Sequence, residues 1–191
     1  MHNFASTAPT PTFPAAAISK DGKPLLSWRV AVLPHLDQHA LYDKFHLDEP
    51  WDSPHNKALL DQIPEVYAPV VRKGEPKGST YYQVFFGPGA LFEGNEGKRF
   101  LDVTDGTSNT FLAVEAAKAV PWTKPEDVAF DKGNPLPKLG GQFDHGFHIA
   151  FADGSVFLIS KTIDVKTLRA LITRNGGEVI SFDNIPSTPR R

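Results

Sequence analysis

An Asp-Gly pair at Asp153-Gly154 lies between two short apolar stretches, residues 147–151 and 155–159. Aromatic and β-branched residues dominate both stretches, and Asp-Gly is among the strongest short-range signals for a tight turn between antiparallel strands. The sequence therefore predicts a β-hairpin at this point. It also predicts that antiparallel pairing shapes the sheet to which the hairpin belongs.

Three further stretches have the composition of strands. Residues 79–86 are β-branched and aromatic and end at Gly87-Pro88-Gly89, which predicts a strand followed by a loop. A second Asp-Gly pair, at Asp105-Gly106, separates residues 100–103 from residues 110–115 and predicts two short strands with a close connection.

Helix signals lie toward both ends of the chain. Ser27 is placed to cap a helix that Pro34 interrupts, so a broken helix is expected to run on to Phe45. Ser53 and a proline at the first helical position predict a short helix over residues 55–63.

A last helix and a long loop complete the predicted elements. Asp164 is placed to cap a helix that ends at Asn175-Gly176-Gly177. Residues 119–141 contain four prolines and predict a long irregular excursion, of the kind that covers a surface or a site.

The length and composition predict one folded unit. A chain of 191 residues, 40% of them hydrophobic, is long enough to bury a core. We expect an extended segment over residues 1–24, a single α+β domain over residues 25–180 and a loose tail over residues 181–191. Within the domain, short helices are expected to pack on an antiparallel sheet.

Composition and motifs also argue against several functions. The formal net charge is −2 and the basic residues form no stripe, which disfavours nucleic-acid binding. The absence of cysteine excludes disulfides and thiol catalysis. No run of about 18 apolar residues is present to span a membrane. The nucleophile elbow, the zinc-protease motif and the Walker A motif are absent, so we expect no enzymatic activity.

Aromatic side chains are the candidates for ligand contact. Trp122 lies in the proline-rich excursion and is expected to be exposed, whereas Trp28 and Trp51 are expected to pack beside helices. Tyr81 and Tyr82 would join Trp122 if all three line one concave surface. Such a surface would suit a small solute or a glycan.

Carboxylates raise the question of a metal site. Oxygen atoms of Asp102, Asp105, Asn109 and Asp153 would suit a calcium ion, but the same residue types are ordinary turn formers. We favour the turn interpretation and expect no cofactor.

Two further groups of polar residues have alternative interpretations. Asp144, His145 and His148 lie close to Asp153 in the sequence, and carboxylates with imidazoles would suit a divalent cation. Histidines three residues apart on a strand point to opposite faces, however, which argues against such a site. Glu115, at the end of an apolar strand, is either a buried carboxylate paired with Arg29 or a partly exposed strand end.

Several separated motifs follow one another along the chain: Ser27-Trp28-Arg29, Leu33-Pro34-His35-Leu36, Tyr42-Asp43-Lys44-Phe45, Leu47-Asp48-Glu49-Pro50-Trp51-Asp52-Ser53-Pro54-His55-Asn56, Asp105-Gly106-Thr107-Ser108-Asn109-Thr110 and Phe151-Ala152-Asp153-Gly154-Ser155. From Phe4 to about Ile180, this succession resembles a bacterial family of unknown function. Its members are pseudopilin-like proteins, described both as solute-binding-protein-like and as carrying a prepilin-type processing-associated His-x9-Asp-Gly domain. The chain departs from that motif, because the position ten residues before Asp153 is Phe143.

The resemblance implies a pilin-like head, similar to those of type II secretion pseudopilins, in the extracytoplasmic cell envelope. Family members begin with a hydrophobic helix, and we expect this chain to be the part that follows such a helix, so that the full-length form is membrane-anchored. The expected partners are like subunits or other envelope proteins, in a structural or interaction role. The alternatives are a small-solute or glycan binding module and, third, an enzyme.

Overall fold

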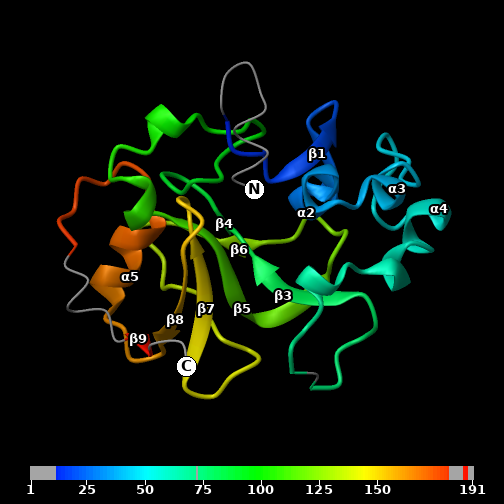
Figure 1. The fold of residues 1–191 in the computed structure, drawn as a ribbon. Helices are drawn as coiled ribbons and strands as arrows, with labels where there is room; N and C mark the ends of the chain where they lie inside the picture. Colours follow the sequence, from blue (N-terminus) through cyan, green and yellow to red (C-terminus); the bar gives the residue numbers. More distant parts are fainter. Residues whose placement is uncertain (1–11, 72, 181–186, 189–191) are drawn as a thin grey trace.

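The computed structural model describes residues 12–71, 73–180 and 187–188. Its architecture is α+β, as the sequence predicts: an antiparallel sheet accompanied by short helices (Figure 1). The loose tail expected over residues 181–191 lies outside the described residues except for Ser187 and Thr188, and so does the extended segment as far as residue 11.

The elements follow one another along the chain as strands, α-helices and single-turn 3-10 helices (η). In order they are β1 Ala17–Lys20, β2 Lys23–Ser27, α2 Trp28–Ala31, η1 Leu33–Leu36, α3 His39–Tyr42, α4 Pro54–Lys57, η2 Leu60–Gln62, η3 Glu65–Tyr67, β3 Ser79–Gln83, β4 Phe85–Phe86, η4 Phe100–Asp102, η5 Thr107–Asn109, β5 Phe111–Pro121, β6 Val128–Ala129, β7 Gly146–Phe151, β8 Val156–Ser160, α5 Val165–Ile172 and β9 Ser187–Thr188.

The main sheet has the strand order β3-β5-β7-β8-β9, and every neighbouring pair in it is antiparallel. The predicted hairpin around Asp153-Gly154 is confirmed as β7–β8, with Ile149 opposite Phe157. Alternation along the strands turns Ile149 and Phe151 toward α5, where they join a buried apolar cluster with Leu171. Figure 1 shows α5 at the β8 side of the sheet and α2, α3 and α4 at the β3 side.

Strands β5 and β7 separate part-way along their length. They are paired from Phe111 opposite Phe151 to Val114 opposite Ile149, and no further. Beyond that point the segment before β7 takes over the pairing edge of β5: Gly140 N donates to Glu115 O at 2.8 Å and Gly141 N donates to Ala116 O at 2.9 Å. We call this separation the fork; it leaves the start of β7 without β5 as a hydrogen-bonding neighbour.

Gly141 makes the close approach at the fork. A Cβ atom at Gly141 would lie 2.3 Å from Ala117 O and 2.4 Å from the Tyr81 ring. Gly141→Ala is therefore expected to lower the free energy of unfolding by about 1–3 kcal/mol, the usual cost of overpacking. Urea unfolding followed by circular dichroism measures it. Gly133→Ala is the matched control, because its Cβ would meet nothing closer than 3.4 Å; equal stability of the two variants would contradict the fork geometry.

The helical side of the molecule has the caps that the sequence predicts. The Ser27 hydroxyl accepts a hydrogen bond from Arg29 N, and the helix is broken into α2, η1 and α3, with Pro34 in the first turn of η1. The Ser53 hydroxyl accepts from Asn56 N, but the helix it begins, α4, ends at Lys57, well before residue 63. Short helices of this kind depend on tertiary packing, because a single turn barely offsets the cost of nucleation.

Four local predictions are wrong in detail. Residues 100–103 form no strand: η4 occupies them, because the Asp102 carboxylate accepts the Arg99 N–H and closes a tight turn. The extended segment contains the β1–β2 hairpin, whose turn residues Asp21 and Gly22 both have positive φ. Strand β5 continues to Pro121 and so enters the predicted excursion, and α5 ends at Ile172, before Asn175.

Candidate functional site

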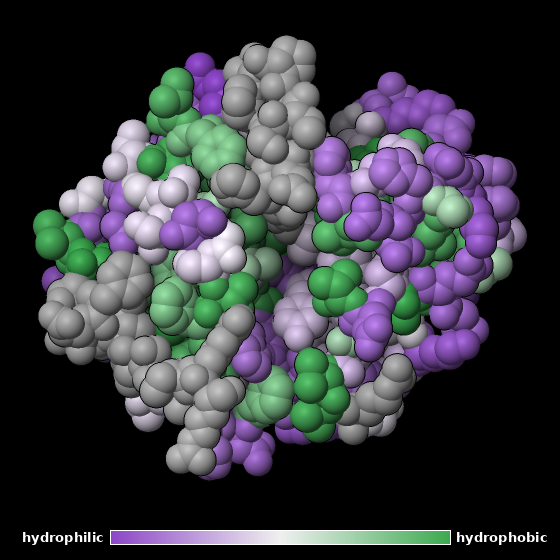
Figure 2. All heavy atoms as spheres, in the orientation of Figure 1, coloured by the Kyte–Doolittle hydropathy of each residue, from purple (hydrophilic) through white to green (hydrophobic). Residues whose placement is uncertain are grey.

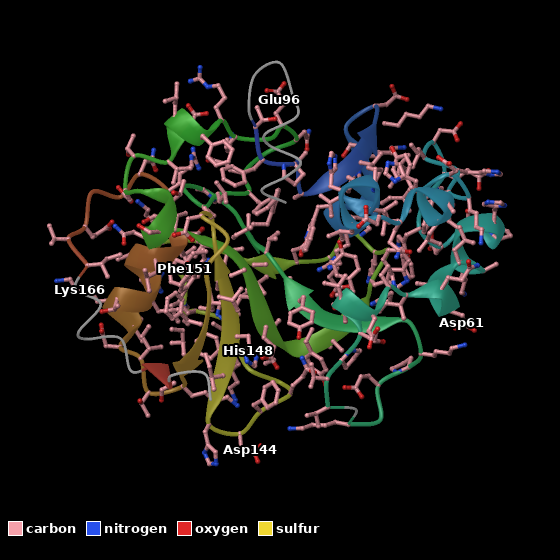
Figure 3. All side chains as sticks on the ribbon, viewed as in Figure 1. Asp61, Glu96, Asp144, His148, Phe151 and Lys166 are labelled. Carbon is pink, nitrogen blue, oxygen red and sulfur yellow. The ribbon has the colours of Figure 1, made fainter. Side chains whose placement is uncertain are left out.

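A groove lies between the exposed face of the main sheet and the helical side of the molecule. It encloses about 300 Å³, at the lower end of the range of small-molecule sites. It is lined by Trp28, Val32, Leu36, Val66, Tyr67, Tyr82, Leu112, Ala113, His148, Ile149, Ala150 and Val156. His148, on β7, is labelled in Figure 3. Figure 2, in the same orientation, shows both hydrophobic and hydrophilic residues on the side of the molecule that faces the viewer.

Small residues form the floor of the groove. Ala113 on β5 lies opposite Ala150 on β7, and alternation places both on the sheet face that α5 does not cover. With only a methyl group at each position, the sheet surface is low there. Val66, on the helical wall, is 58% exposed. The site is therefore an open apolar groove rather than a closed core.

A buried carboxylate lies at one end of this floor. Alternation puts Glu115 on the same face as Ala113, and the Glu115 side chain is 0% exposed. Its Oε2 accepts hydrogen bonds from His148 N at 3.0 Å and from His148 Nδ1 at 3.1 Å. Among the described residues, its Oε1 has no hydrogen-bond partner although it is buried.

The fork explains why this carboxylate is there. His148 N would continue the β5–β7 ladder, but the Glu115 carbonyl is already taken by Gly140 N. The Glu115 side chain therefore supplies the acceptor that the backbone does not. Of the two interpretations that the sequence left open for Glu115, the structure shows the buried carboxylate and not the partly exposed strand end. The pairing with Arg29 is wrong, because the partner is His148.

Aromatic rings border the same end of the groove. Tyr82 lies opposite Glu115 in the β3–β5 register. Burial raises the pKa of Tyr82, so the hydroxyl stays protonated at neutral pH. The ring of Phe143 meets the His148 ring edge-on at 5.2 Å between centroids.

The three aromatic residues predicted to bind a ligand do not share one surface. Tyr82 lines the groove, but Tyr81 is its neighbour on the strand and points to the other face, where it is buried. The predicted exposure of Trp122 is wrong, because this side chain is 0% exposed. Its position follows β5, which continues to Pro121 and carries Trp122 into the core instead of a surface loop.

The four predicted metal ligands are engaged by groups of the protein itself. Asp102 binds Arg99; Asp105 accepts hydrogen bonds from Gly176 N and Gly177 N; Asn109 Nδ2 donates to Asp105 O; and Asp153 accepts from Ser155 N and Oγ. Within residues 12–71, 73–180 and 187–188, no group of three or more His, Cys, Asp or Glu side chains is arranged to hold a metal ion. Of the other metal candidates, Asp144 forms an exposed ion pair with Lys73, away from His148.

The ion pair between Asp102 and Arg99 is expected to make the stability of the fold depend on pH. Hydrogen bonds from Arg99 lower the pKa of Asp102 from 3.8 to about 2. A carboxyl group whose pKa is lower in the folded than in the unfolded state stabilises the fold at pH values above its unfolded-state pKa. This stabilisation is lost as the pH falls through the folded-state pKa. Asp102→Asn is therefore expected to lower the melting temperature at pH 7 and to flatten its decline between about pH 4 and pH 2. Thermal unfolding at a series of pH values measures this. Arg99→Gln should give the same flattening; unchanged profiles in both variants would contradict the prediction.

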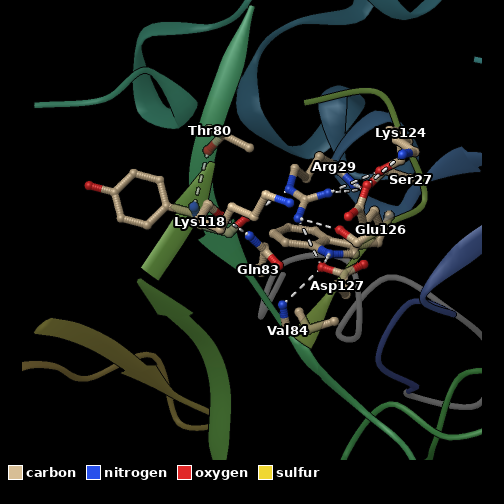
Figure 4. A network of polar contacts seen from close by, with 11 residues as sticks. Ser27, Arg29, Thr80, Gln83, Val84, Lys118, Lys124, Glu126 and Asp127 are labelled. Atoms are coloured by element: carbon tan, nitrogen blue, oxygen red, sulfur yellow. Dashed lines mark hydrogen bonds and ion pairs between the residues drawn. The ribbon is translucent and has the colours of Figure 1, made fainter. Parts of the chain in front are cut away.

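A second buried ionic group joins the two walls of the groove (Figure 4). Arg29 Nη2 lies 2.8 Å from Asp127 Oδ1, and the two side chains are 0% and 5% exposed. Asp127 Oδ1 also accepts from Trp28 Nε1 at 3.1 Å and from Val84 N at 3.0 Å, while Arg29 Nε donates to Tyr82 O at 2.7 Å.

This network links α2, β3 and the segment before β6, and so fixes Trp28 and Tyr82 relative to each other. Burial lowers the pKa of Arg29 and raises that of Asp127, and each charge opposes the shift of the other. Nothing in the local sequence around Asp127 signals this role, because all its partners are distant in the chain.

Comparisons with known proteins give one match. Residues 1–87 match the model of a family described as a protein of unknown function (DUF1559). No curated protein and no solved structure matches. Along the described part of the chain, no helix has the length and hydropathy needed to cross a lipid bilayer. The chain is thus similar, over its first 87 residues, to a family whose function is uncharacterised.

Proposed function

We propose that this chain is a non-enzymatic binding domain of the bacterial cell envelope, and that the groove accepts a small, largely apolar ligand. The observation that carries the proposal is the low floor of Ala113 and Ala150 beneath walls that include Trp28 and Tyr67. Apolar concave sites with a few polar groups are typical of small-molecule binding. Here Tyr82 and His148 supply those polar groups.

The lining of the groove supports binding rather than catalysis. No Ser, Thr, Cys or Lys, the side chains that most often serve as nucleophiles beside a base, lines the groove. The imidazole of His148 is engaged by Glu115. A glycan is a poorer match than an apolar ligand, since a sugar needs more hydroxyl partners than Tyr82 and His148 provide.

Filling the groove tests the proposal. The neutral fluorophore N-phenyl-1-naphthylamine is expected to increase in fluorescence when it is titrated with the protein, and Ala150→Leu is expected to remove that increase by occupying the floor. Ala58→Leu is the matched control, because Ala58 is exposed and lines no part of the groove. Circular dichroism checks the fold of both variants. Absence of a fluorescence change with the unaltered protein, or its survival in Ala150→Leu, would overturn the proposal.

A pseudopilin-like structural role is the second candidate. The ordered motifs across the chain, which resemble those of pseudopilin-like proteins, favour it. In this role the domain assembles with like subunits or other envelope proteins. Sedimentation velocity of the chain, with membrane fractionation of the full-length gene product, tests it: a monomer at all concentrations, with no envelope association, would count against assembly.

A further inference from the structure

We infer that the groove is selective for a small amphipathic organic cation, whose apolar body lies over Ala113 and Ala150 and whose ammonium group lies at the Glu115 end. This inference rests on the proposed role of the groove as a ligand site. It adds the charge and the orientation of the ligand, which the apolar walls alone do not determine.

The first observation is a buried carboxylate oxygen that has no hydrogen-bond donor among the described residues. The Glu115 side chain is 0% exposed, and its hydrogen bonds in the described part of the chain come from the two nitrogen groups of His148 alone. Both bonds use Oε2, which leaves Oε1 buried without a donor. An unsatisfied buried carboxylate oxygen is costly, and an ammonium group would supply the missing donor and the opposite charge.

The second observation is that the groove itself supplies no cation. No Lys or Arg lines it. The guanidinium of Arg29, which lies behind Trp28 and Tyr82, is held by Asp127 at 2.8 Å. The field at the Glu115 end is therefore set by a carboxylate, and like-charged ligands are disfavoured there.

The third observation concerns access. The His148 side chain covers the carboxylate but is 37% exposed, so its ring lies at the mouth of the groove instead of in the core. The inference requires this ring to turn away from Glu115 when the ammonium group binds. Tyr82, opposite Glu115 in the sheet, also lines the groove and adds an aromatic side chain at this end.

A matched set of ligands tests the inference. Tryptamine, tryptophol and indole-3-propionate share one ring system and differ in carrying an ammonium, a hydroxyl or a carboxylate. Isothermal titration calorimetry at pH 7 is expected to show tryptamine binding at least tenfold more tightly than tryptophol, and indole-3-propionate binding more weakly than both. This comparison uses the unaltered protein, so it does not depend on the folding of a variant.

Two variants locate the selectivity. Glu115→Gln is expected to remove the tenfold preference for tryptamine while it leaves tryptophol binding within twofold. Glu65→Gln, which changes an exposed carboxylate beside Val66, is the control and should preserve the preference. Equal binding of tryptamine and tryptophol, or a preference that survives in Glu115→Gln, would overturn the inference. If the neutral fluorophore binds while the amine preference is absent, the inference fails and the proposed function stands; if nothing binds, the proposed function fails as well.

Discussion

Asp127→Ala is expected to lower the free energy of unfolding by about 3–5 kcal/mol. The substitution leaves the Arg29 guanidinium buried, 0% exposed, without the carboxylate that lies 2.8 Å from it. It also removes the acceptor for Trp28 Nε1 and Val84 N. A buried charge with no partner costs far more than the ion pair gains. Urea denaturation followed by circular dichroism measures the change.

Two comparisons separate burial from charge in that result. Asp61→Ala removes the carboxylate of an exposed pair with Lys77, in which both side chains are more than 60% exposed, and should cost no more than about 1 kcal/mol. The double variant Arg29→Met with Asp127→Leu removes both charges and should be more stable than Asp127→Ala alone. A loss below about 1 kcal/mol for Asp127→Ala would show that Arg29 is solvated in the folded protein.

Local signals account for the elements that the sequence predicted correctly. Asp153-Gly154 gives the β7–β8 hairpin because the turn and its two strands are adjacent in the chain. Ser27, Ser53 and Asp164 are found as caps because a cap needs only the two or three residues that follow it. Asp21-Gly22 is also an Asp-Gly pair, and the same rule applied to it predicts the hairpin that β1 and β2 form.

The candidate site depends on pairings that no local pattern records. The sequence left open whether Glu115 is buried, and its partner His148 lies 33 positions away and is set by the fork between β5 and β7. The fork arises where residues 138–141 replace β7 as the hydrogen-bonding neighbour of β5. Which of these two segments pairs with β5 is not recorded in the sequence around Glu115, because both are distant from it in the chain. Ala113 and Ala150 become a groove floor only through the same register. Sequence alone thus indicated one carboxylate of the site and missed the groove.

Trp122→Ala is expected to lower the free energy of unfolding by about 3–5 kcal/mol, because the substitution leaves a large cavity in the core. Trp122 is 0% exposed, its ring lies 5.7 Å from Phe45 and 6.1 Å from Tyr67 between centroids, and its Nε1 donates to Leu60 O. Urea unfolding measures the loss, and Trp51→Ala, at a partly exposed ring, should cost less. Since Tyr67 also lines the groove, Trp122→Ala should weaken fluorophore binding as well. Substitution of a tryptophan on the surface would have neither effect. Equal stability of Trp122→Ala and Trp51→Ala would therefore contradict the buried position of Trp122 and favour the exposed position that the proline-rich sequence suggests.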